Sequence, residues 1–143
     1  MKIANLVVEG NNIRQISDIL FNHKDDFYKG EPHMYRDGDI VVLMREHYYR
    51  RVSSYIMSVI FMKFIDDNKV EIELVSSGGK EGVLMMDLGA EKVENRDIVN
   101  QIISVCSINS WEITTMLPED LMESIKESTI NEIKEKIVDP FNK

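Results

Sequence analysis

Three histidines and one cysteine are the residues of this chain best suited to bind a metal ion or to act as a base or nucleophile. They are His23, His33, His47 and Cys106, and no two of them stand at a metal-ligand spacing such as HxxxH or CxxC. A structural zinc site needs four ligands of this kind. We therefore predict no metal site, no cofactor and no catalytic residue, and we expect the protein not to be an enzyme.

Two of these residues fall on expected helices. His23 lies on the apolar face of the first one, where a hydrogen-bonded core histidine is the expected outcome. Cys106 lies late in the second, where the negative end of the helix dipole disfavours the nucleophilic thiolate. We expect Cys106 to pack as a small buried hydrophobic residue.

A glycine-rich segment at residues 78–82 could bind phosphate through its backbone amides. A phosphate-binding loop requires a helix N-terminus directly after it, whereas the residues that follow here favour a strand. The aspartate pairs at 25–26 and 66–67 lie in turn-like sequence, without the apolar neighbours that acid–base catalysis requires. We interpret the glycine segment as a hairpin loop and the aspartates as solvated side chains.

Tyrosine and arginine gather in one segment near the middle of the chain, and both residue types are enriched among the main contributors to protein interfaces. The candidate interface residues are Arg45, His47, Tyr48, Tyr49, Arg50, Arg51 and Tyr55. Aromatic and basic residues also stack single-stranded nucleic acid, but an acidic chain would repel its backbone. Cross-strand tyrosine pairs on an ordinary sheet explain the same pattern, so that alternative stays open.

The formal net charge of −8 disfavours nucleic-acid binding, because neutralising phosphates requires lysine and arginine. No apolar run approaches the roughly 20 residues that cross a bilayer, so we expect no membrane association. The single cysteine excludes an internal disulfide and fits a reducing compartment, which predicts a cytoplasmic protein. A chain of 143 residues is the size of one domain.

Alternating and 3.6-residue apolar patterns, separated by turn residues, predict the elements that position these side chains. We expect strands at 3–8, 39–50, 55–65, 69–76, 83–88 and 110–116, and helices at 13–27, 95–108 and 118–137. Asn12 is the expected N-cap of the first helix, and residues 28–38 are expected to form a surface loop. The fold class is α+β, with an antiparallel meander sheet of about five strands and two or three helices packed mainly on one face.

Apolar side chains occupy both odd and even positions in the segments 39–50 and 55–65. One set of helices covers only one face of a sheet, so the second face needs another cover. We take its residues to be Val41, Leu43, Met57, Val59 and Phe61. We predict a self-associating module, a homodimer that pairs through this face or through the tyrosine-rich hairpin. The alternative is a small apolar ligand held between sheet and helices, because nine methionines suit an adaptable lining.

Three short motifs resemble a family of small uncharacterised bacterial α+β proteins. They are Arg45-Glu46-His47-Tyr48-Tyr49, the glycine segment at 78–82, and Leu88-Gly89-Ala90-Glu91. In that family a tyrosine-rich strand leads into a meander, and a glycine loop precedes a strand that ends in a Gly-Ala-Glu step. The resemblance extends over residues 40–103, leaves the tail from Trp111 outside, and implies no activity.

Overall fold

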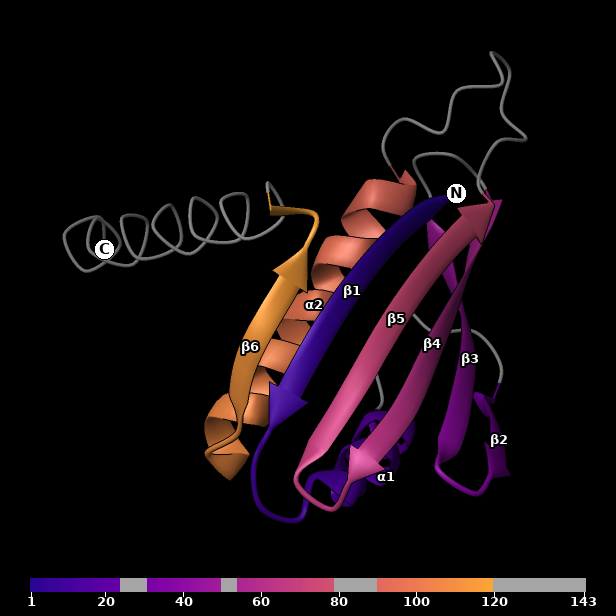
Figure 1. Ribbon diagram of the computed structural model, residues 1–143. Helices are drawn as coiled ribbons and strands as arrows, with labels where there is room; N and C mark the ends of the chain where they lie inside the picture. The colour runs from indigo at the N-terminus through magenta and orange to yellow at the C-terminus, as the bar shows by residue number, and fades with distance from the viewer. Residues whose placement is uncertain (24–30, 50–53, 79–89, 120–143) are drawn as a thin grey trace, which may run out of the picture.

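The computed structural model describes residues 1–23, 31–49, 54–78 and 90–119, which form a mostly-sheet α+β fold (Figure 1). One antiparallel sheet has six strands in the order β2-β3-β4-β5-β1-β6, one more strand than the expected number of about five. The strands are β1 (Lys2–Glu9), β2 (His33–Asp37), β3 (Ile40–Tyr49), β4 (Ser54–Asp66), β5 (Lys69–Gly78) and β6 (Glu112–Leu117). The helices are the 3₁₀ turn η1 (Ile13–Gln15), α1 (Ile16–Asn22) and α2 (Ala90–Asn109).

Both α-helices lie behind the sheet in the view of Figure 1, so they share one side of it. We call this side the inner face and the opposite side the outer face. Alternate residues of each strand point to the inner face, where they form one core with the helices. Its fully buried members include Leu6, Ile13, Ile16, Leu20, Leu43, Ile60, Met62, Ile72, Leu74, Ile98 and Ile102. Within the described residues, no helix is long and apolar enough to cross a membrane.

The strands β2, β3, β4 and β5 follow one another as a meander, and β1 pairs along the free edge of β5. The edge strand β6 then pairs with β1 and is joined to it at one end by Trp111, whose indole N–H donates to the backbone oxygen of Asn11 (2.7 Å). The expected strand at 83–88, residues 79–82 of the expected hairpin loop and the part of the last expected helix after residue 119 lie outside the described residues.

The turn between β4 and β5 is formed as its composition predicts. The backbone N–H of Asn68 donates to Asp66 Oδ1 (2.7 Å), which is the local bond that favours aspartate in turns. Asp67 is exposed and accepts a hydrogen bond from Arg14 Nε (2.7 Å), while Arg14 Nη1 reaches Asp39 Oδ1 (3.0 Å). The hydrogen bonds to Asp67 and Asp39 raise the pKa of Arg14. These two contacts join η1 to the turn between β4 and β5 and to the turn between β2 and β3.

Three local predictions are wrong. The strand β2 lies inside the expected loop, because it pairs with β3 across a turn at Gly38, whose φ of +56° suits glycine. The first helix ends at Asn22, and His23 is extended (ψ 114°) and exposed instead of buried in the core. Asn12 adopts a left-handed conformation (φ 59°) and makes no side-chain cap.

Candidate functional site

The candidate interface residues separate onto the two faces of the sheet. Tyr48 and Tyr55 are direct partners on β3 and β4, and their rings pack with centroids 5.1 Å apart on the outer face. Arg45 and His47 point to the inner face, where they are only 4% and 9% exposed. Because a side chain beneath a helix cannot meet a second molecule directly, only Tyr48 and Tyr55 of these four residues remain candidates for contact with a partner.

The other three candidates are Tyr49, at the end of β3, and Arg50 and Arg51, which follow it in the sequence. The side chains of Tyr49, Arg50 and Arg51 lie outside the described part of the chain, so their assignment stays a prediction.

A buried polar cluster joins the inner face to α2. His47 Nδ1 lies 2.8 Å from Glu94 Oε2, so the ring N–H donates to the carboxylate. Ser58 Oγ donates to the other oxygen, Glu94 Oε1, over 2.9 Å. Glu94 is completely buried, and its two oxygens therefore link α2 to β3 and β4 at once.

The cluster extends across the sheet in one row. Ser58 and Ser76 are cross-strand partners on β4 and β5, with their hydroxyl oxygens 3.4 Å apart. Ser76 Oγ donates to Asn95 Oδ1 on α2, and Arg45 Nη1 donates to Gln101 Oε1 (3.2 Å) two turns further along the helix. Each of these side chains thus makes at least one hydrogen bond to a polar partner, as the burial of such groups favours.

Chemically, the cluster brings together one imidazole and one carboxylate that are 47 residues apart in the sequence. The carboxylate fixes the ring tautomer, because it accepts the proton of Nδ1. Among the described residues, no group of three or more histidine, cysteine, aspartate or glutamate side chains is placed to hold a metal ion. We assign the cluster a positioning role, which is to set α2 at one place on the sheet.

The sequence does contain a signal for this cluster, which our interpretation missed. Ser58 and Ser76 occupy inner positions between apolar residues, and a buried hydroxyl needs a hydrogen-bond partner. Glu94 lies one residue before the expected helix at 95–108, whereas α2 begins at Ala90 and includes it.

Cys106 is a buried residue of the core, as expected, and it is only 2% exposed. Burial in apolar surroundings raises the pKa of its thiol from 9.0 to about 11. The thiolate is therefore disfavoured, and the residue packs as a small hydrophobic side chain.

This shift predicts how Cys106 affects stability in alkaline solution. The folded pKa lies above the unfolded value, so the contribution is complete below pH 9.0 and is lost as the pH rises to about 11. We expect the advantage of the wild type over Cys106→Ala to shrink by about 2 kcal/mol across that interval. Urea unfolding of both proteins at each pH measures it, because the other titrating groups are common to both. A constant difference would contradict the prediction.

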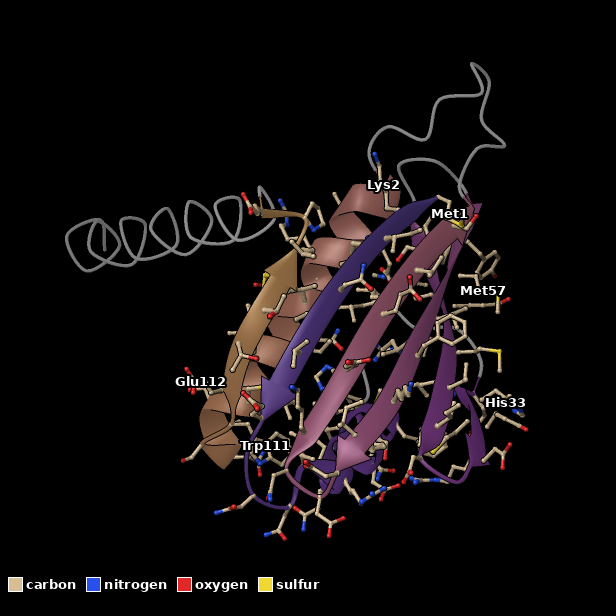
Figure 2. The ribbon with its side chains drawn as sticks, in the orientation of Figure 1. Met1, Lys2, His33, Met57, Trp111 and Glu112 are labelled. Carbon is tan, nitrogen blue, oxygen red and sulfur yellow. The ribbon has the colours of Figure 1, made fainter. Side chains whose placement is uncertain are left out.

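The outer face carries most of the exposed large hydrophobic residues of the described chain, and no described helix covers it (Figure 2). Cross-strand partners share a face, which places the following residues there: Ile3, Tyr35, Ile40, Tyr55, Met57, Phe61 and Leu117. Each is between 41% and 52% exposed. The half-buried residues Val42, Met44, Val59 and Val75 fill the spaces between them.

The expected membership of the second face is therefore partly wrong. Val41 pairs with the buried residue Met62, and Leu43 pairs with the buried residue Ile60. Val41 and Leu43 therefore belong to the inner core. Met57, Val59 and Phe61 do lie on the outer face. The periodicity of one strand shows which residues share a face, but the register of the hairpin decides which face of the neighbouring strand joins them.

A shallow hollow of ≈ 450 Å³ lies on the outer face over β4, β5, β1 and β6. Phe61, Ile40 and Leu117 contribute apolar surface to its lining. Lys63, Glu71 and Glu73 contribute charge. The hollow is thus on the side of the sheet away from α1 and α2. The expected ligand cavity was placed between sheet and helices instead.

Comparison of the chain with protein-family models, with curated proteins and with solved structures finds no match in any of the three.

Proposed function

We propose that this protein is a non-enzymatic interaction module that forms a homodimer by packing the outer face of its sheet against the same face of a second copy. The observation that carries the proposal is the uncovered apolar surface centred on Phe61, Val42 and Val59. Both described α-helices pack on the inner face, so burial of the outer face requires another cover. Sheets commonly bury such faces against each other at a spacing of about 10 Å.

The size of the outer face supports a stable dimer. Six strands of 5 to 13 residues, spaced about 4.8 Å apart, present an area of about 700 Å². A standard interface buries about 800 Å² on each partner, so this face alone nearly reaches that value. The face is not wholly apolar, because Glu71 and Glu73 of β5 also lie on it, but its exposed apolar residues extend over several neighbouring strands, which is typical of interaction surfaces.

Sedimentation velocity of the purified chain over a range of micromolar concentrations tests the proposal. We expect a concentration-dependent shift from one chain to two, since an interface of standard size gives dissociation constants in the micromolar range or below. A single species with the mass of one chain at every concentration would overturn it.

The second candidate function is binding of a small apolar ligand, and the hollow beside Phe61 and Leu117 favours it. A ligand there would occupy part of the surface that dimerisation uses, so the two functions would compete. Native mass spectrometry of the purified protein distinguishes them. A dimer without added mass supports self-association, whereas a monomer with a bound apolar molecule supports the ligand.

A further inference from the structure

The outer residues of β3 and β4 form four consecutive cross-strand pairs, and their order is informative. The two central pairs are apolar, Met44 with Val59 and Val42 with Phe61. The next outer residue of β3 beyond these pairs is Glu46, which pairs with Met57. One step beyond them at the other end lies Lys63, which pairs with Ile40. A carboxylate and an ammonium group thus flank an apolar centre at equal distances.

Both charged side chains are exposed on the outer face. The outer residues considered are those of β3 from Ile40 to Tyr48 and those of β4 from Tyr55 to Lys63. Among them, only Glu46 and Lys63 are charged. Neither forms a salt bridge within the described part of the chain. Lys63 has a carboxylate, Glu71, as its cross-strand neighbour on β5, whereas the neighbour of Met57 there is Ser77.

From this spacing we infer the symmetry of the dimer: its two-fold axis lies perpendicular to the strands, over Val42, Met44, Val59 and Phe61, and pairs Glu46 with Lys63 of the partner subunit. The inference rests on the proposed function and specifies its geometry. Rotation about this axis exchanges the two ends of the apolar centre. Glu46 of each subunit therefore lies near Lys63 of the partner subunit, and the dimer contains two such pairs. The charged groups lie about 10 Å to either side of the axis, which their side chains can span between sheets about 10 Å apart.

The alternative axis runs parallel to the strands and fits these charges less well. Rotation about it would leave each cross-strand row at the same position along the strands. Glu46 would then face the row of the second copy that contains Met57 and Ser77. Lys63 would face the level of Ile40 and Glu71, and Glu46 would be buried without a cation. An unpaired carboxylate inside an interface is costly, which favours the perpendicular axis for Glu46. Glu73, the β5 neighbour of Phe61, lies on the outer face under either axis and does not distinguish the two.

Charge reversal tests the arrangement. We expect Glu46→Lys and Lys63→Glu each to raise the dissociation constant of the dimer about tenfold, because each substitution places like charges together at two symmetric positions. The double variant E46K/K63E is expected to return close to the wild-type dissociation constant. Restoration would not follow from the position of residue 63 beside Glu71 in the same chain, because the double variant still places a glutamate there next to Glu71.

Glu112→Lys is the matched control, since Glu112 is an exposed carboxylate on the edge strand β6, far from β3 in the sheet (Figure 2). It makes the same change in net charge as Glu46→Lys and the opposite change to Lys63→Glu, and it is expected to alter the dissociation constant less than threefold. If the wild type is a dimer but the single variants match this control, or the double variant is no tighter than they are, the arrangement is overturned and self-association stands. A wild type that stays monomeric overturns both. Circular dichroism of each variant verifies that it is folded.

Discussion

Replacing Glu94 with alanine is expected to lower the free energy of unfolding by about 3–5 kcal/mol. The side chain is fully buried and accepts hydrogen bonds from His47 and from Ser58. Its removal takes away the acceptor that both donors share and leaves a cavity between α2 and the sheet. The loss is large because water cannot replace the carboxylate at a site without solvent access.

Urea unfolding followed by circular dichroism measures this loss, with Glu112→Ala as the control. Glu112 is exposed on β6, so its truncation is expected to change stability by less than about 0.5 kcal/mol. Glu94→Gln keeps an oxygen acceptor but removes the charge, and we expect an intermediate loss of about 1–3 kcal/mol. A loss below about 1 kcal/mol for Glu94→Ala would show that the cluster does not hold α2 in place.

The sequence predicts much of the fold because its signals are local. Strict alternation through Val70, Ile72 and Leu74 identifies β5, and the helical spacing of Ile98 and Ile102 identifies α2. Burial of every second residue in a half-covered sheet produces these patterns directly. The α+β class and the inner placement of the helices follow from the same signals.

The strand order could not be read from such patterns. β1 lies between β5 and β6, and the pairing of Val7 with Thr115 joins opposite ends of the described chain. Nothing in the alternation of either strand specifies its neighbour, because pairing depends on the global packing of the sheet over the helices. The strand β2 was missed for a related reason, since its mostly exposed residues carry no apolar alternation of their own.

The polar cluster escaped prediction because its two main members are distant and individually ordinary. His47 belongs to a segment whose aromatic and basic composition suggests an exposed interface, yet its inner position places it beneath α2. Only the register of β3 against β4, in which His47 meets Ile56 and Tyr48 meets Tyr55, separates the buried residues from the exposed ones. A single register step would have exchanged their faces.

Replacing Phe61 with aspartate is expected to convert the dimer to a monomer at micromolar concentration. Phe61 lies opposite Val42 near the centre of the outer face, with its side chain on the surface of the monomer. Central aromatic residues commonly contribute 2 kcal/mol or more to an interface, and a buried unpaired carboxylate adds a penalty. Because both subunits carry the change, we expect the dissociation constant to rise by a factor of at least about 100, or roughly 3 kcal/mol.

Sedimentation velocity and thermal unfolding of the same sample separate loss of association from loss of folding. Phe61 is 41% exposed and contributes little to the inner core, so the isolated subunit should remain folded. Ile108→Asp is the matched control, because Ile108 is an exposed apolar residue near the end of α2, on the inner side of the sheet. It makes the same change from a hydrophobic to a charged side chain and should leave the dimer intact. A folded Phe61→Asp protein that still dimerises like the wild type would place the contact elsewhere on the chain, because two carboxylates near the centre of a sheet-to-sheet interface could not be desolvated together.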